Sequence, residues 1–172
     1  ALVADVLEAL SDSERVERIF VLTDDGAVAD AARANGADVI LRVPDPGLNE
    51  AIDAAASECA VAGYDALLVS LGDLPLLRGR DVDEVVAAGE RAPVVIVPAA
   101  DGGTALLLRR PPLVIPARFG PESCAAHEAA ARERGVDAVV LGSIAESART
   151  DLDTPEDAER LASSNSAGRT AV

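Results

Sequence analysis

Short apolar runs alternate with amphipathic stretches along most of the chain. Continuous apolar runs predict buried strands, and apolar positions spaced three and four apart predict helices. The expected strands span 18–22, 37–42, 66–71, 94–98, 104–110 and 137–141, and the expected helices span 1–10, 26–36, 48–63, 80–90, 120–135 and 153–162. This alternation is typical of the α/β class, with a mostly parallel sheet and helices on both faces. The run 66–71, apolar except for Ser70, has the composition of a strand near the centre of such a sheet.

Glycine and acidic or hydroxyl residues mark the expected helix ends. Gly36 is placed to end the helix 26–36. Asp81 is expected to cap the helix 80–90, with Glu84 in the reciprocal position. Thr154 is expected to cap the last helix, with Pro155 at its first position.

Composition and charge narrow the function classes. A length of 172 residues predicts one domain, here 1–162, followed by a flexible tail at 163–172. The net charge is −15, lysine is absent and aromatic residues make up 2%, so nucleic acid is not an expected partner. No apolar run reaches the length of a membrane span. The two cysteines, Cys59 and Cys124, indicate a reducing compartment, and a cytoplasmic location is expected.

Three carboxylates are candidates for a metal site. Asp73 follows the apolar run 66–71, where the end of a parallel strand would carry a ligand. Asp151 and Asp153 lie two residues apart, so in an extended segment they share a face. Together the three would form an all-oxygen site suited to Mg²⁺ or Mn²⁺. The alternative is structural: Asp153 caps the following helix, and Asp73 belongs to a plain turn.

A further candidate region surrounds the predicted start of the helix 120–135. Thr104 ends a glycine-rich turn, and Gly120 and Ser123 stand at a helix start that could favour an anion, with Arg118 just before it. A plain turn and a plain helix start explain the same residues equally well. The single histidine, His127, is expected to be a partly buried or surface residue of the helix 120–135, and it forms no recognisable nucleophile–base set. Transfer of a nucleotidyl group to a phosphate fits this set, because it needs metal and positioning more than a strong base.

The combined motifs resemble the guanylyltransferases that act on 2-phospho-L-lactate or phosphoenolpyruvate in coenzyme F-420 biosynthesis. The matching segments, in this order, are PGLNEAI (46–52), GDLPLL (72–77), DGGTALLL (101–108), RFGPES (118–123) with His127, and DLDTPED (151–157). The resemblance implies a nucleotide-diphospho-sugar transferase-like fold. It also implies coupling of GTP to the substrate phosphate with release of diphosphate. Phosphoglycerate is a third substrate that the sequence does not distinguish from these two.

The resemblance also implies roles for individual residues. Asp73, Asp151 and Asp153 would be catalytic and hold Mg²⁺ or Mn²⁺. The acid substrate would be lined by Thr104, Arg118, Gly120 and Ser123, and the nucleotide by Asn49 and Gly72. Members of the family begin with a strand and a basic loop that this sequence lacks. The sequence is therefore expected to be an N-terminally shortened version. Whether the shortened chain is active by itself stays open. A non-catalytic fragment or partner domain, another nucleotidyltransferase, and a homodimer all remain open.

Overall fold

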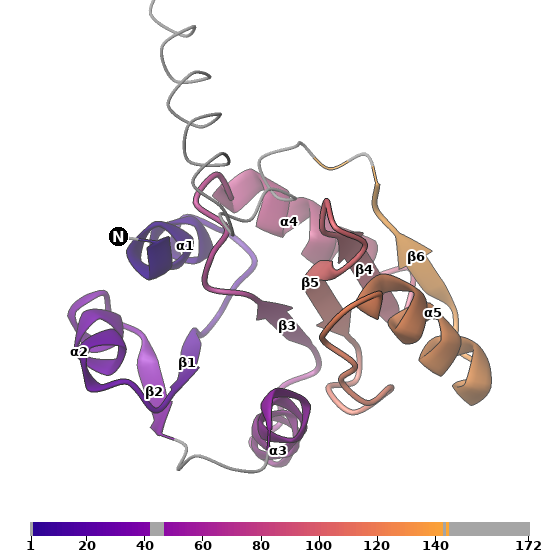
Figure 1. Ribbon diagram of the computed structural model, residues 1–172, viewed down its shortest axis with the longest axis horizontal. Coiled ribbons are helices and arrows are strands. Elements are labelled where there is room, and N and C mark those ends of the chain that lie inside the picture. The colour runs from indigo at the N-terminus through magenta and orange to yellow at the C-terminus, as the bar shows by residue number, and fades with distance from the viewer. Residues whose placement is uncertain (1, 42–46, 143, 145–172) are drawn as a thin grey trace, which may run out of the picture.

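The computed structural model describes residues 2–41, 47–142 and 144, which form alternating helices and strands (Figure 1). The helices are α1 (Leu2–Ser11), α2 (Gly26–Ala34), α3 (Leu48–Val61), α4 (Gly79–Ala88) and α5 (Ser123–Arg134). The strands are β1 (Phe20–Thr23), β2 (Asp38–Leu41), β3 (Leu67–Ser70), β4 (Val94–Pro98), β5 (Thr104–Arg109) and β6 (Ala138–Val140). The α/β class is therefore confirmed. The expected helix 153–162 and the tail 163–172 lie outside the described residues.

The strands are arranged in two sheets. β1 and β2 form a parallel pair, and the second sheet has the order β3-β5-β4-β6. β5 runs antiparallel to both of its neighbours, whereas β4 and β6 are parallel. The pairing is thus mixed, which corrects the expectation of a mostly parallel sheet. The short connection 99–103 between β4 and β5 explains this, because a parallel crossover needs a dozen residues or more.

The position of β3 is a second correction. In the part of the chain that the structure describes, β3 pairs with β5 on one side only and is therefore an edge strand of its sheet. Its side chains are all half-buried. The strands that are buried throughout are β5 and nearly all of β4. The apolar composition of 66–71 predicted a strand correctly but not its neighbours.

Helices cover both faces of the four-stranded sheet, as expected. Successive side chains of a strand point to opposite faces, so β4 and β5 contribute to two cores. One set packs with α1 and α4 and consists of Val95, Val97, Leu106 and Leu108. The other set packs with α3 and α5 and consists of Val94, Ile96 and Leu107. The second core holds α3 and α5 on one side of the sheet, where the contacts among Thr104, Ser123 and His127 lie.

The parallel pair β1–β2 has a small core of its own with α1 and α2, built on Leu7, Ala32 and Ala37. Helix α2 begins at a side-chain cap, because the Asp25 carboxylate accepts hydrogen bonds from the amides of Ala27 (2.7 Å) and Val28 (3.1 Å). Gly36 follows this helix with a φ of +78°, as its predicted role requires.

Helix α4 begins earlier than expected. Its N-cap is Arg78 and its first residue is Gly79, so Asp81 lies three residues after the cap instead of at it. The Asp81 carboxylate accepts from the Arg78 amide at 3.2 Å and thereby supplies the reciprocal half of a capping box. Within the described residues, no helix combines the length and the apolar composition needed to cross a bilayer.

Candidate functional site

Asp73 lies in the turn that follows β3, as the sequence predicts. Its side chain is half-buried, and its Oδ1 atom is buried without a hydrogen-bond partner among the described residues. A buried carboxylate oxygen is stabilised by a hydrogen-bond donor or by a cation. Gly72, beside it, is exposed, and a Cβ atom there would lie 3.4 Å from the side chain of Val3. Because Gly72 is exposed, its backbone is accessible on the side that faces away from Val3.

The other two predicted metal ligands, Asp151 and Asp153, lie outside the described residues. Within 2–41, 47–142 and 144, no group of three or more acidic, histidine or cysteine side chains could hold a metal ion. The predicted convergence of Asp73 with Asp151 and Asp153 therefore stays a prediction.

Thr104 and Ser123, both predicted to line the acid site, are brought together by the fold, and that role stays a prediction. Thr104 begins β5, Ser123 begins α5, and both side chains are almost fully buried. The Ser123 hydroxyl donates to Thr104 Oγ1 at 3.1 Å. His127, one turn further along α5, places Nδ1 3.0 Å from the same oxygen. Three polar side chains from β5 and α5 thus share one hydrogen-bond centre, Thr104 Oγ1.

The hydrogen bonds fix the tautomer of His127. The Arg118 amide donates to Nε2 at 2.9 Å, so Nε2 accepts and the proton of the neutral ring is on Nδ1. Nδ1 then donates to Thr104 Oγ1. Burial, reinforced by the charges of Arg109 and Arg118, lowers the pKa of His127 to about 4. The imidazole is therefore neutral at pH 7, and it packs edge-on against Phe119 with ring centroids 5.0 Å apart.

The loop before α5 is held by helix α3. Asn49 makes two hydrogen bonds to the backbone of Phe119, accepting from its amide at 2.6 Å and donating to its carbonyl at 3.0 Å. One turn further along α3, the Asp53 carboxylate accepts from the Ala117 amide at 3.0 Å. Together with the contact from Arg118 to His127, these bonds fix the residues that lead into Gly120. The amide of Asn49 is thus used within the protein, and its predicted nucleotide contact stays a prediction.

Asp53 also neutralises a buried cation. Arg109, at the end of β5, is 0% exposed and donates from Nη1 to Asp53 Oδ1 at 2.6 Å and to the Ile115 carbonyl at 3.0 Å. Nε and Nη2 of Arg109 are buried without a partner among the described residues. A buried guanidinium depends on its counter-charge, so this pair ties α3, β5 and the loop into one unit.

The helix start at Ser123 is less open to an anion than predicted. The Ser123 amide donates to the Gly120 carbonyl at 3.2 Å, and the Cys124 amide donates to the Gly102 carbonyl at 3.4 Å. Gly120 is exposed, with a φ of +133° that favours glycine. Arg118 is also exposed, and its Nη1 donates to the Ala117 carbonyl at 3.2 Å. Arg118 and Gly120 are exposed at this corner, as are Pro121 and Glu122.

Sequence reasoning missed the residues that support the site. Asp53 was assigned only to a helix, and Arg109 only to the end of a strand. His127 was expected to be a partly buried or surface helix residue, whereas it is fully buried and linked to Thr104. A carboxylate on the apolar side of α3, one turn after Asn49, was the only signal available, and it does not name its partner.

Comparisons with known proteins show which family the chain belongs to. The chain matches the family model described as guanylyl transferase CofC like over residues 1–167. A phosphoenolpyruvate guanylyltransferase from Sphaerobacter thermophilus is 35% identical over 163 residues, covering 94% of this chain and 77% of the relative. A 3-phospho-D-glycerate guanylyltransferase from Phenylobacterium zucineum is 37% identical over 180 residues, covering 99% of this chain and 79% of the relative. A 2-phospho-L-lactate guanylyltransferase from Methanothermobacter thermautotrophicus is 34% identical over 157 residues, covering 91% and 68%.

A solved structure supports the fold at lower sequence identity. A protein from Desulfovibrio desulfuricans G20, described as a nucleotide-diphospho-sugar transferase, superposes with a TM-score of 0.76 at 20% identity. The match covers 97% of this chain and 74% of that protein. This likeness confirms the expected architecture. The match over 1–167 shows that the chain belongs to the CofC-like guanylyl transferase family, as its motifs predict, and this family membership confirms the expected nucleotidyltransferase class.

Proposed function

We propose that this protein transfers the guanylyl group of GTP to the phosphate of a small phosphorylated carboxylic acid, phosphoenolpyruvate or 2-phospho-L-lactate, in the supply of coenzyme F-420. An oxygen of the substrate phosphate forms a bond to the α-phosphorus of GTP. The bond from that phosphorus to the oxygen bridging the β-phosphate breaks, and diphosphate leaves. Two relatives support this reaction. One, 35% identical, is named as a phosphoenolpyruvate guanylyltransferase, and the other, 34% identical, as a 2-phospho-L-lactate guanylyltransferase.

The observation that carries the proposal is the convergence of Thr104 and Ser123, 3.1 Å apart, beside Gly120 and Arg118. Arg118 supplies a cation for the carboxylate or phosphate of the acid. The loop that presents Arg118 and Gly120 is held by Asn49, Asp53 and His127 before the substrate arrives. Preorganisation of this kind lowers the cost of positioning a substrate.

No strong base is needed for this transfer. The second pKa of a phosphate monoester is about 6, so its oxygen is ionised at neutral pH. His127 is neutral and already committed on both ring nitrogens. We assign it to positioning Thr104 and not to proton transfer.

The donor set at Asp73 fits a divalent cation. Its Oδ1 is buried without a partner among the described residues, and Mg²⁺ or Mn²⁺ prefers carboxylate oxygens. We expect Asp151 and Asp153 to complete the site, with the nucleotide beside Gly72. When bound, the ion would neutralise the charge of the phosphates that have to meet.

We also place the enzyme in the cytoplasm, which its free cysteines Cys59 and Cys124 support.

The reaction is tested by incubating the protein with GTP, Mg²⁺ and phosphoenolpyruvate, 2-phospho-L-lactate or 3-phospho-D-glycerate in turn. Diphosphate release and the mass of the guanylylated acid are measured. Asp73→Asn should lower turnover on the order of a hundredfold or more, because it removes a ligand charge and keeps the shape. Asp30→Asn is the matched control, because Asp30 is an exposed carboxylate on α2.

Metal binding is measured separately from turnover, by titrating Mn²⁺ and following its paramagnetic resonance signal. The Asp73→Asn variant should bind Mn²⁺ more weakly than the Asp30→Asn variant. Equal Mn²⁺ affinity in the two variants, or near-normal diphosphate release by Asp73→Asn at limiting Mg²⁺, would contradict a metal role for Asp73.

A further inference from the structure

Glu122, the N-cap residue of α5, has a backbone conformation that favours glycine. Its φ is +55° and its ψ is 26°, and it is the only residue other than glycine with a positive φ in the described part of the chain. A side chain is disfavoured in this left-handed region, whereas glycine adopts it readily. The Glu122 carboxylate accepts no hydrogen bond from the first turn of α5, although its charge lies near the positive end of the helix dipole. Helix capping therefore explains only part of the choice of glutamate at this position.

The Glu122 carboxylate lies against the turn that leads into β5. A Cβ atom at Gly102 would lie 3.4 Å from Oε1 and 3.6 Å from Oε2 of Glu122. The backbones of the two segments are joined as well, because the Cys124 amide donates to the Gly102 carbonyl at 3.4 Å. The guanidinium of Arg118 donates to the Ala117 carbonyl and not to this carboxylate. The negative charge of Glu122 is thus held at the turn, and Arg118 does not neutralise it.

This contact places a carboxylate beside the predicted acid site. Gly102 lies two residues before Thr104, and Glu122 immediately precedes Ser123. The hydroxyl oxygens of Thr104 and Ser123 lie 3.1 Å apart, and both side chains are almost fully buried. An acid that reaches these hydroxyl groups therefore passes close to the Glu122 carboxylate. We call the two segments together, 101–104 and 118–124, the acid corner.

The exposed side chains of the acid corner carry charges of both signs. Arg118 is positive, and Glu122 and Asp101 are negative. The Asp101 carboxylate accepts from the Gly103 amide at 2.8 Å, so one of its oxygens is used within the turn. A phosphorylated acid is therefore attracted by Arg118 and repelled by Glu122, and the net charge of −15 on the chain adds to the repulsion.

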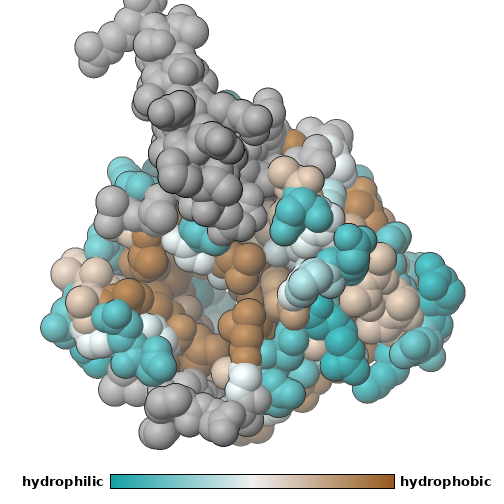
Figure 2. Space-filling model, in the orientation of Figure 1, coloured by the Kyte–Doolittle hydropathy of each residue, from teal (hydrophilic) through white to brown (hydrophobic). Residues whose placement is uncertain are grey.

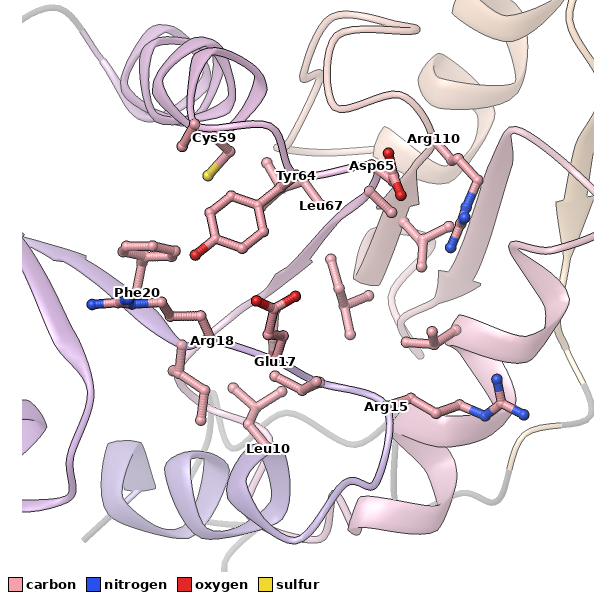
Figure 3. A pocket seen from close by; sticks show the side chains of 18 of the residues that line it. Leu10, Arg15, Glu17, Arg18, Phe20, Cys59, Tyr64, Asp65, Leu67 and Arg110 are labelled. Atoms are coloured by element: carbon pink, nitrogen blue, oxygen red, sulfur yellow. The ribbon is translucent and has the colours of Figure 1, made fainter.

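Two cavities between β1 and β3 lie apart from the acid corner. The smaller, about 300 Å³, is lined mainly by apolar side chains and forms a hollow that is visible in Figure 2. The larger, about 470 Å³, is lined in part by charged side chains, among them Arg15, Glu17 and Arg110 (Figure 3). No residue of 101–104 or 118–124 lines either cavity. Neither cavity therefore helps to discriminate between acids at this corner.

We propose that Glu122 determines specificity at the acid site by excluding small acids that carry an anionic group beyond one carboxylate and one phosphate. The inference rests on the proposed function, because it concerns the acid of that reaction. An acid with two charged groups can turn both of them toward cations such as Arg118. A third charged group on the same small molecule comes close to Glu122, where like charges repel each other and the carboxylate loses water. Phosphoenolpyruvate and 2-phospho-L-lactate carry only the two permitted groups.

The test measures how tightly the protein binds two acids that differ by one phosphate, 3-phospho-D-glycerate and 2,3-bisphospho-D-glycerate. Their dissociation constants are measured by isothermal titration calorimetry at one fixed concentration of free Mg²⁺, so the test needs no turnover. The wild type should bind the bisphosphate more weakly than the monophosphate. Glu122→Gln removes the charge and keeps the length of the side chain. In this variant the dissociation constant of the bisphosphate, divided by that of the monophosphate, should fall about tenfold.

Further variants and a salt series separate the charge from other effects. Glu133→Gln makes the same change at an exposed residue in the last turn of α5, about 16 Å further along the helix, and should leave the ratio unchanged. Glu122→Gly should lower the ratio as Glu122→Gln does, and it should also raise the thermal midpoint, because glycine relieves the left-handed backbone. Raising the ionic strength from about 0.1 M to about 1 M shortens the screening length from about 10 Å to about 3 Å. The difference between wild type and Glu122→Gln should therefore shrink.

The results that would overturn the inference differ in what they imply for the proposed function. The role of Glu122 alone is wrong if both acids bind but the ratio is the same in wild type, Glu122→Gln and Glu133→Gln. It is also wrong if the wild type binds the bisphosphate as tightly as the monophosphate. If the wild type binds neither of these acids, and neither phosphoenolpyruvate nor 2-phospho-L-lactate, the acid site itself is wrong and the inference falls together with the proposed function.

Discussion

His127 Nδ1 lies 3.0 Å from Thr104 Oγ1 and donates to it, while the other ring nitrogen, Nε2, carries no proton. Nε2 accepts from the Arg118 amide at 2.9 Å, so a proton added to Nε2 would face another N–H group. Burial and the charges of Arg109 and Arg118 act in the same direction and lower the pKa of His127 to about 4. The neutral imidazole is therefore part of the folded structure.

Stability should depend on pH between about 4 and 6.5, where unfolded His127 binds a proton and folded His127 does not. Since the unfolded state binds more protons in this window, the free energy of unfolding should rise with pH. The stabilisation that comes from neutral His127 should be lost as pH falls toward 4. The full contribution is on the order of 3 kcal/mol. Urea unfolding from pH 4 to 7 measures it.

His127→Gln is the control for this dependence. The chain has a single histidine, so the difference between wild type and the variant isolates this residue from the carboxylates. The variant should be less stable at pH 7 and should show a shallower loss on acidification. Parallel pH profiles for the two proteins would rule out a depressed pKa at His127.

Removing Asp53 should be strongly destabilising. Asp53→Ala leaves Arg109, 0% exposed, without its counter-charge at 2.6 Å and the Ala117 amide without its acceptor. Breaking a buried pair in this way costs about 3–5 kcal/mol, whereas an exposed pair contributes about 0–1 kcal/mol. Asp30→Ala, which removes the exposed partner of Arg33, is the comparison in urea unfolding. The double variant Asp53→Ala/Arg109→Met should recover much of the lost stability, because it removes the unpaired cation as well. No recovery would mean that Asp53 acts mainly by holding the loop at Ala117.

Thr104→Val should weaken the site more than its change in shape suggests. Valine keeps the volume but removes the oxygen that accepts from Ser123 at 3.1 Å and from His127 at 3.0 Å. Each buried donor left without an acceptor costs about 1–3 kcal/mol. We expect lower stability and a higher KM for the phosphorylated acid, with both restored in Thr104→Ser. Equal effects of valine and serine would show that the methyl group, not the hydroxyl, matters.

Gly79 should not tolerate a side chain, although it is the first residue of a helix. A Cβ atom there would lie 2.7 Å from the backbone carbon of Asp12, at the end of α1. Backbone cannot move aside cheaply, so Gly79→Ala should cost about 1–3 kcal/mol. At Gly26, the first residue of α2, a Cβ atom would meet no atom of the described residues within 4 Å, so Gly26→Ala should be neutral or stabilising by up to about 1 kcal/mol. Thermal unfolding of the two variants compares them; equal midpoints would refute the close contact.

Local sequence patterns predicted the helices, the strands and the family, because all three depend on short stretches of sequence. The helix expected at 26–36 is observed as Gly26–Ala34, with Gly36 just beyond it at a positive φ, and the strand expected at 104–110 is observed as Thr104–Arg109. Asp81 shows the limit of such signals. A capping residue and a residue three positions inside a helix share the same preferences, so only the contact with the Arg78 amide distinguishes them.

The sequence by itself determined the alternation of helices and strands and the motifs of a guanylyl transferase, because periodicity and motif spacing are local properties. Only the tertiary structure decided which edges meet. It set β5 antiparallel to β4, and it placed β1 and β3 on the wall of one largely apolar cavity. It also brought Asp53 to Arg109 and His127 to Thr104, across separations of 56 and 23 positions. Such pairs depend on the packing of α3 and α5 against one sheet, and no residue type or spacing within a single segment encodes its distant partner.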